Sequence, residues 1–384
     1  MSFAPAPPPP TPLGRYRVLS PLAGIRVSPL ILGGMSIGDE WAKVGMGAMD
    51  KESSFNLLDA YYEAGGNFID TANAYQEESS EIFIGEWAEK RGIRDQLVIA
   101  TKYSTLFKRG DDIKIKINYM GNNAKSLKIS VEASLKKLRT HYIDIMYVHW
   151  WDFNTSIEEV MDNLHHLVVA GKVLYLGISD TPAWIVSYAN QYAKANGKTP
   201  FVIYQGAWNV MDRSFERDII PMARTCGLAL APWNVLSAGR LRTDAEEKRR
   251  LDSGEGGRTW YAPEGWMRNE DEKKMSAALE KVAKEIGTEH ITAVAIAYVM
   301  QKTTFVFPII GGRKIEHLMA NIEALKISLS DEQISYLESI IPFDLGFPQR
   351  IFGDGTRVLE HLTADAGKED RVPPRQPIRP ANLG

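Results

Sequence analysis

The sequence has a single cysteine, Cys226, among its 384 residues. One cysteine cannot form an intrachain disulfide, which is typical of proteins that fold in a reducing compartment. The sequence also lacks an apolar run of the ~18 residues that a membrane-spanning helix needs. Its first twelve residues are rich in proline but have no apolar signal-peptide stretch. We therefore expect a soluble, cytoplasmic protein with no membrane partner.

Neither sign of charge dominates the composition, because 45 basic residues stand against 48 acidic ones. There is no basic stripe, so nucleic acid is not an expected partner. The seven histidines include one adjacent pair, His165 and His166, whose spacing is not that of metal ligands. No metal site is predicted. We expect a monomer or a weak homo-oligomer.

Eight short apolar runs alternate along the chain with stretches of helical periodicity. They cover residues 30–32, 68–69, 97–100, 143–148, 173–178, 201–204, 228–231 and 305–309. Continuous apolar character is typical of strands buried on both faces of a parallel sheet. Eight such units predict a (β/α)8 barrel, which is an α/β fold. The competing doubly wound sheet usually carries G-x-G-x-x-G after its first strand, and the nearest match, residues 45–50, lacks the third glycine.

We expect this barrel to be one domain covering residues 15–345. Two β-like runs within residues 15–27 predict an N-terminal hairpin that closes the bottom of the barrel. Residues 1–14 are predicted to be a disordered proline-rich tail, and residues 346–384 an irregular C-terminal tail. Residues 240–272, after the seventh strand, lack clear periodicity and are typical of a lid, a binding loop or a disordered segment.

Four polar residues fall at or just after predicted strand ends, where barrels of this kind build their active sites. Asp70 and Tyr75 follow the second strand, Lys102 ends the third and His149 ends the fourth. Each alone could be a cap, an ion-pair partner or a core residue. Together they suit proton transfer to a carbonyl whose carbon receives a hydride. A buried ammonium lowers the pKa of a phenol, and a carboxylate keeps that ammonium charged.

Residues 66–75, 101–102 and 147–149 resemble the aldo-keto reductases, NADP-dependent oxidoreductases built on a (β/α)8 barrel. The resemblance spans roughly residues 27–330. It implies that Tyr75 is the general acid and base, that Lys102 lowers its pKa, that Asp70 pairs with Lys102, and that His149 orients the carbonyl. The proline-rich start, with residues 28–30, 35–38 and 342–348, resembles the fungal aryl-alcohol dehydrogenase and norsolorinic acid reductase branch more closely.

The resemblance also implies a set of NADP(H) contacts. Asp180 stands where the family usually has asparagine, and residues 234–240 resemble the loop that covers the pyrophosphate. Arg313 or Lys314 would pair with the 2′-phosphate, so NADP(H) is expected rather than NAD(H). The expected cofactor-binding residues are Ser179, Asp180, Gln205, Trp233, Asn234, Leu236, Ser237, Gly239, Arg240, Gly312, Arg313, His317 and Asn321.

Most of the tryptophans fall in predicted βα loops, and aromatic walls with few charges favour a flat apolar substrate. Trp41, Trp150 and Trp208 are the expected substrate contacts. We predict an enzyme that reduces aryl aldehydes or ketones with NADP(H), reversibly as an aryl-alcohol dehydrogenase. Two alternatives stay open: a redox-sensing regulatory subunit that binds NADP(H) with little turnover, and a ketone reductase of a polyketide secondary-metabolite pathway.

Overall fold

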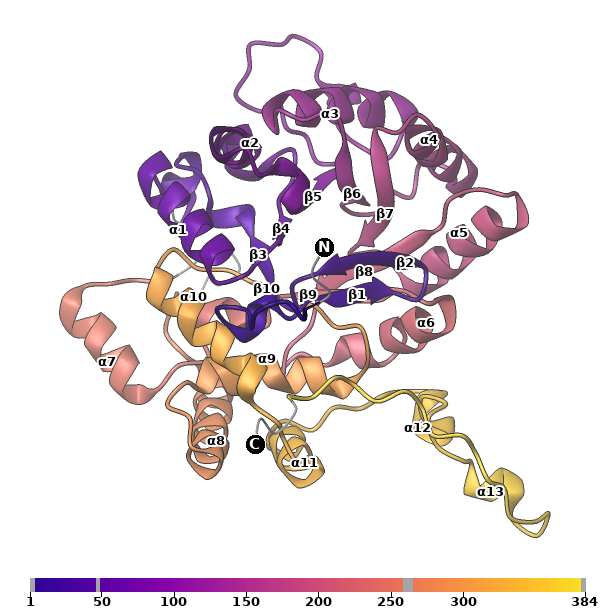
Figure 1. Ribbon diagram of the computed structural model, residues 1–384. Coiled ribbons are helices and arrows are strands. Elements are labelled where there is room, and N and C mark those ends of the chain that lie inside the picture. The colour runs from indigo at the N-terminus through magenta and orange to yellow at the C-terminus, as the bar shows by residue number, and fades with distance from the viewer. Residues whose placement is uncertain (1–3, 46–48, 258–264, 381–384) are drawn as a thin grey trace.

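The computed structural model describes residues 4–45, 49–257 and 265–380. Eight parallel strands form a barrel in which neighbours along the chain are neighbours in the sheet, and β10 returns beside β3 (Figure 1). The strands are β3 Ile31–Gly33, β4 Phe68–Asp70, β5 Val98–Tyr103, β6 Ile143–Val148, β7 Val173–Ser179, β8 Phe201–Ala207, β9 Ala229–Trp233 and β10 Ile309–Ile310. This arrangement confirms the predicted (β/α)8 barrel.

Helices surround the barrel on its outside (Figure 1). They include α1 Lys51–Glu63, α2 Ser79–Arg91, α3 Ala124–Lys137, α4 Ile157–Val169, α5 Ala183–Ala195, α6 Ile219–Cys226, α9 Ile291–Lys302 and α10 Ile315–Ile322. The others are α7 Asp244–Ser253, α8 Glu270–Ile286, α11 Asp331–Ile340, α12 Gln349–Phe352 and α13 Glu360–Thr363. None of these described helices is both long and apolar enough to span a bilayer.

The eighth strand is shorter than the predicted run of residues 305–309. Only Ile309–Ile310 form β10, which pairs with β3. Phe305 has a φ of 58° and Pro308 has no backbone N–H, so the run cannot continue as a regular strand. A single parallel bridge between Leu230 and Val306 joins this segment to β9 and closes the barrel.

The predicted hairpin consists of the antiparallel strands β1 Arg17–Ser20 and β2 Ala23–Val27. Leu19 and Val27 are fully buried in one apolar cluster with Phe68, Ile145 and Phe307 from inside the barrel. Figure 1 shows the hairpin lying across the end of the barrel. It therefore closes the N-terminal end, and the C-terminal strand ends remain as the mouth.

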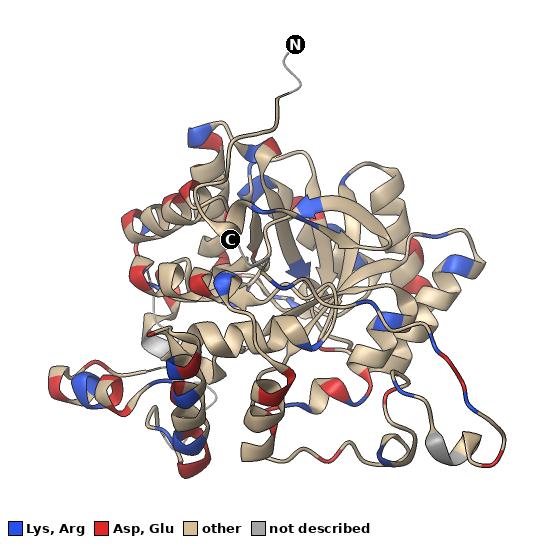
Figure 2. Cartoon of the chain, turned by 60° about the horizontal axis from the view of Figure 1, so that its bottom comes forward, with Lys and Arg blue, Asp and Glu red and all other residues tan. Residues whose placement is uncertain are grey.

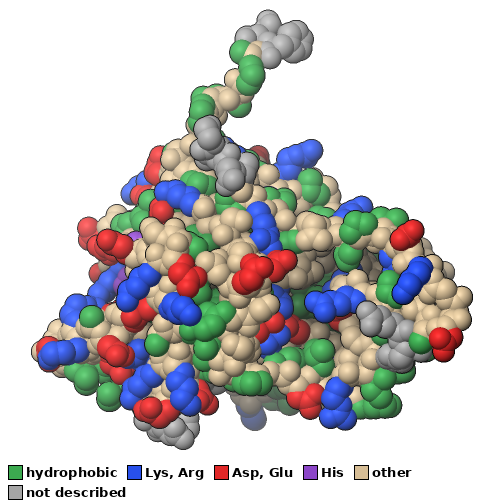
Figure 3. Space-filling view, turned by 90° about the horizontal axis from the view of Figure 1, so that it is seen from below, with side chains coloured by type: hydrophobic (Ala, Val, Ile, Leu, Met, Phe, Trp, Pro, Cys, Tyr) green, Lys and Arg blue, Asp and Glu red, His purple; other side chains and the backbone are tan. Residues whose placement is uncertain are grey.

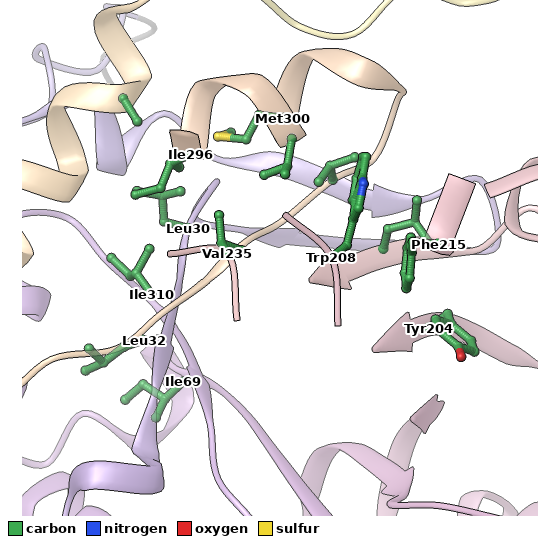
Figure 4. Packing of buried hydrophobic residues seen from close by; sticks show 14 of the residues in the cluster. Leu30, Leu32, Ile69, Tyr204, Trp208, Phe215, Val235, Ile296, Met300 and Ile310 are labelled. Carbon is green, nitrogen blue, oxygen red and sulfur yellow. The ribbon is translucent and has the colours of Figure 1, made fainter. Parts of the chain in front are cut away.

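A second apolar cluster fills the space between the barrel and its helices (Figure 4). Leu32 and Ile69 of the strands contribute to it, as do Ile296 and Met300 of α9. Because the strands are packed on both faces, their sequences read as continuous apolar runs. Charged side chains of both signs are interspersed on the outer helices (Figure 2), and the face in Figure 3 shows the same mixture.

The chain termini differ in part from the predicted tails. The disordered tail was predicted to extend to residue 14, which is too far, because Pro12–Gly14 form a 3-10 turn with Leu13 buried. Thr11 fixes this turn by donating to the Ala64 carbonyl at 2.6 Å. The chain beyond residue 345 contains α12 and α13 and extends away from the barrel in Figure 1. Near the end of the chain, Arg379 forms an ion pair with Asp331 at the start of α11.

The predicted loop of residues 240–272 contains a helix, α7. Its helical periodicity is weak because charge, not an apolar face, fixes the segment. Glu247 of α7 is buried and accepts from Arg242 at 2.6 Å and from Arg268 at 3.0 Å. Each charge of such a buried pair compensates for the water that the other has lost, so removing one partner destabilises the fold. Trp260 and Tyr261, two aromatic residues of this predicted loop, lie outside the described residues.

Candidate active site

The four residues predicted to be catalytic come together at the mouth of the barrel. Lys102 lies on β5 and is completely buried. Its Nζ donates to Asp70 Oδ1 at 2.5 Å, to the Thr71 carbonyl at 2.8 Å and to Tyr75 Oη at 3.2 Å. The register that pairs Asp70 with Ala100 places Lys102 beyond the end of β4, beside the loop that carries Tyr75. One ammonium therefore links the carboxylate to the phenol.

Burial and neighbouring charges act in opposite directions on the pKa values of Lys102 and Tyr75. Burial disfavours the ammonium of Lys102, but the neighbouring Asp70 and Tyr75 raise its pKa above the ordinary value, so it stays charged. Burial also raises the pKa of Tyr75, and the Lys102 ammonium works against that rise. The expected effect of Lys102 on Tyr75 is thus present, but the net shift is upward. Tyr75 is a protonated phenol at neutral pH.

His149 directly follows β6 and faces the same site. Burial and the nearby Lys102 charge hold the pKa of His149 well below its usual range, so the imidazole is neutral at neutral pH. Its Nδ1 lies 3.1 Å from the Thr105 hydroxyl. When this hydroxyl donates to Nδ1, the single ring N–H is on Nε2. A neutral imidazole of that tautomer is suited to donate to a carbonyl oxygen.

Tyr75 is followed by three consecutive residues with positive φ, Gln76 at 52°, Glu77 at 46° and Glu78 at 81°. Such a conformation costs non-glycine residues about 1–2 kcal/mol each. Side-chain contacts hold the turn: Gln76 Nε2 donates to the Met35 carbonyl at 2.9 Å, and Glu78 pairs with Lys137 at 2.9 Å. Sequence reasoning missed this turn, because no glycine marks it.

Two of the three tryptophans expected to contact substrate lie beside residues predicted to be catalytic. Trp41 packs edge-on against Tyr75 with ring centroids 6.1 Å apart, and Trp150 stacks on His149 at 4.1 Å. The prediction for Trp208 is wrong. Its side chain is completely buried and stacks on Phe215 at 5.4 Å in the outer core (Figure 4), so it cannot face a substrate.

Asp180, at the end of β7, links two of the expected cofactor residues. Its carboxylate accepts from Trp233 Nε1 at 3.0 Å and from Ser179 Oγ at 3.0 Å. Asp180 is exposed at the surface, but the surrounding protein atoms displace part of the water around its carboxylate. Loss of hydration there raises the pKa of Asp180 to about 6. The carboxylate is therefore mostly ionised at neutral pH and can accept from an amide.

Gln205, expected to contact the cofactor, forms a hydrogen bond with Asp70, one of the four residues predicted to be catalytic. Its Nε2 donates to Asp70 Oδ2 at 2.9 Å, and both side chains are buried. The two oxygens of Asp70 are thus bound separately, one by Lys102 and one by Gln205. Sequence reasoning placed Gln205 at a strand end but missed this contact, which joins residues 135 positions apart.

The loop expected to cover a pyrophosphate is a compact turn after β9. Asn234 Oδ1 accepts from the Ala238 backbone at 2.7 Å, and the Ser237 hydroxyl lies 3.9 Å from Met211 Sδ. Leu236 packs partly against the core, and Gly239 has a φ of 85°. Arg240, the expected anion donor, bonds Glu272 at 2.7 Å and the Gly265 carbonyl at 3.0 Å. Its guanidinium is therefore already engaged.

The remaining expected cofactor residues surround the end of β10. A small, partly enclosed hollow there is lined in part by Gly312 and Asn321. Arg313 is exposed and His317 is half-buried. Lys314 pairs with Glu255, just after α7, at 3.0 Å. The end of β10 therefore offers the partly exposed backbone of Gly312, the exposed guanidinium of Arg313 and the buried amide of Asn321.

Comparison with known proteins assigns the chain to a family. The profile described as "Aldo/keto reductase family" matches residues 29–342. The chain belongs to the aldo/keto reductase family. The predicted membership is confirmed, and the four residues at the mouth lie within the matched region.

Three similar proteins of this family come from fungi. The chain is 63% identical to an aryl-alcohol dehydrogenase [NADP(+)] of Phanerodontia chrysosporium over 98% of its length and 99% of the relative. It is 60% identical to a putative aryl-alcohol dehydrogenase of Saccharomyces cerevisiae, covering 96% and 98%. A norsolorinic acid reductase of Emericella nidulans is 50% identical, covering 99% and 97%. These similarities confirm the predicted branch of the family.

Proposed function

We propose that this protein reduces aryl aldehydes and ketones with NADPH, and works reversibly as an aryl-alcohol dehydrogenase. The observation that carries the proposal is the chain of hydrogen bonds from Asp70 through Lys102 to Tyr75, next to a neutral His149. The 63% identity to a relative whose name specifies aryl alcohols and NADP(+) supports the substrate class and the cofactor.

Each catalytic residue then has one role. Tyr75 donates a proton to the carbonyl oxygen, and the Lys102 ammonium, 3.2 Å from Tyr75 Oη, stabilises the phenolate that forms. Asp70 keeps Lys102 charged and in place. His149 donates its N–H to the same carbonyl oxygen and orients the substrate. In the oxidation direction, the phenolate of Tyr75 takes the proton back from the alcohol.

The chain offers groups that fit NADP(H). When bound, NADPH supplies the hydride that the carbonyl carbon receives. Asp180 can accept from a carboxamide NH2 beside Trp233. Gly312, with a φ of 154°, precedes α10 and allows backbone donors to approach a phosphate. Arg313 has no ion-pair partner within the described ranges and would pair with the 2′-phosphate.

We also propose a cytoplasmic location and a monomer or weak homo-oligomer, with no nucleic-acid partner. The single cysteine supports a reducing compartment. The net charge of -3 and the mixed surface charges support the absence of a nucleic-acid surface.

A second candidate is reduction of a ketone on a polycyclic aromatic substrate, in a polyketide pathway. The 50% identical norsolorinic acid reductase favours it, as does the exposure of Trp150, 44%, since an open wall accommodates a larger ring system. A higher kcat/KM for aryl ketones than for benzaldehydes would favour this candidate.

The test is steady-state reduction of veratraldehyde with NADPH and with NADH. We expect turnover above about 1 per second with NADPH, and a preference over NADH of about tenfold or more, because the 2′-phosphate adds charge-assisted contacts. Arg313→Ala should reduce that preference. Slow NADPH release without measurable turnover would instead favour the redox-sensing subunit.

A further inference from the structure

Four aromatic rings from three loops, those after β3, β4 and β6, lie in a row across the mouth. Trp41 contacts Tyr75 edge-on, Tyr75 contacts His149 with centroids 5.9 Å apart, and His149 stacks on Trp150. The two tryptophans thus flank the pair proposed to hold the carbonyl. Whatever fixes the indole of Trp41 also shapes the space for the substrate ring.

Glu77 holds that indole. Trp41 Nε1 donates to Glu77 Oε1 at 2.9 Å, and the Trp41 backbone N–H donates to Gln76 Oε1 at 2.7 Å. The indole is 7% exposed, which fits a ring held from both sides. Glu77 forms no ion pair with any residue in the described ranges, whereas its neighbour Glu78 pairs with Lys137. Its carboxylate is therefore available as a charge-assisted acceptor for Trp41.

The backbone conformation explains why consecutive side chains can contact one tryptophan. Because Gln76 and Glu77 are both left-handed, their side chains turn back toward the loop that follows β3. The same turn begins directly after Tyr75. The position of Trp41 is thus coupled to that of the catalytic phenol through a short, strained segment.

We propose that Glu77 is a specificity-determining residue, whose carboxylate fixes Trp41 as the aromatic wall for aryl substrates. The inference rests on the proposed function, because it assigns the aryl group of the substrate to the side of Trp41. Glu77 does not touch the reacting atoms. It acts through Trp41, so its loss affects binding of aryl groups and spares the chemical step.

The experiment measures two quantities for Glu77→Ala: the KM and kcat for veratraldehyde against propanal, and the Kd of veratryl alcohol for the NADPH-loaded protein. The second complex contains reduced cofactor and alcohol and cannot react, so it reports binding without turnover. We expect KM and Kd for the aryl ligands to rise about tenfold, in line with loss of a charge-assisted hydrogen bond. We expect kcat, and the KM for propanal, to stay within about twofold.

Matched variants isolate the hydrogen bond. Glu77→Gln keeps an acceptor and should restore most of the aryl affinity. Trp41→Phe keeps a ring but has no N–H, so it should raise the aryl KM by itself, and adding Glu77→Ala to it should change little. Glu40→Ala removes an exposed carboxylate beside Trp41 and should leave both constants unchanged.

Equal effects of Glu77→Ala on veratraldehyde and propanal would overturn the proposal, as would additivity in the Trp41→Phe background. If Glu77→Ala does not fold, an unchanged aryl KM in Trp41→Phe would also overturn it. The two readouts separate the claims. A native protein that binds veratryl alcohol more tightly than Glu77→Ala but reduces no aldehyde would support the role of Glu77 and refute the proposed function.

Discussion

Replacing Tyr75 by phenylalanine is expected to lower kcat for veratraldehyde reduction by about 10²–10⁴-fold, the usual contribution of a general acid. The phenol lies 3.2 Å from the Lys102 ammonium and is the proton donor in our account. Phenylalanine keeps the ring that packs between Trp41 and His149. The site should therefore retain its shape, and the Kd for NADPH should stay within about twofold. Stopped-flow and fluorescence titration measure the two quantities.

The matched control for Tyr75→Phe is Tyr188→Phe on α5, where the ring is 53% exposed and far from any proposed role. Its kcat for veratraldehyde and its Kd for NADPH should equal those of the native protein. Because the pKa of Tyr75 is shifted upward, the phenol stays protonated between about pH 6 and 8. We therefore expect kcat for veratraldehyde reduction not to fall over this range. A Tyr75→Phe protein that keeps more than a tenth of native kcat would contradict the assignment.

Replacing Lys102 by methionine is expected to abolish activity and to destabilise the fold. The substitution leaves the Asp70 carboxylate buried with only Gln205 as a polar partner among the contacts seen here. Breaking a buried ion pair in this way costs about 3–5 kcal/mol, which corresponds to a fall in Tm of roughly 5 °C for a protein of this size. Differential scanning calorimetry and the veratraldehyde assay test both effects.

The double variant Asp70→Asn with Lys102→Met separates stability from catalysis. It removes both charges, and asparagine can still accept from Gln205, so most of the lost Tm should return. Activity should not return, because nothing then stabilises the phenolate of Tyr75. A single Lys102→Met variant as stable as the native protein would show that the pair is not held as described.

The barrel and the cluster of four polar residues could be predicted because both depend on local patterns. Strands packed on two faces leave continuous apolar runs, and the residue that ends such a run falls at the mouth. Asp70, Lys102 and His149 follow this rule directly. Tyr75 lies in a loop, and only its distance from Asp70 and the resemblance of residues 66–75 to a known family marked it.

The partners of these residues could not be predicted, because contacts between distant segments decide them. Gln205 bonds Asp70 across the barrel, and the guanidinium of Arg240, expected beside a pyrophosphate, pairs with the Glu272 carboxylate. Trp208 follows a strand end like Trp150, yet its side chain turns into the outer core to stack on Phe215. Likewise, α7 is fixed by the buried carboxylate of Glu247, and no apolar periodicity reveals such a helix.

The central claim, hydride transfer to an aryl carbonyl at this mouth, is tested most directly by isotope transfer. Native protein is incubated with veratraldehyde and NADPH deuterated at the reactive C4 position, and the product alcohol is analysed by mass spectrometry and NMR. We expect one deuterium per molecule at the benzylic carbon, with the hydroxyl proton coming from Tyr75. An alcohol product without deuterium at that carbon would contradict the central claim.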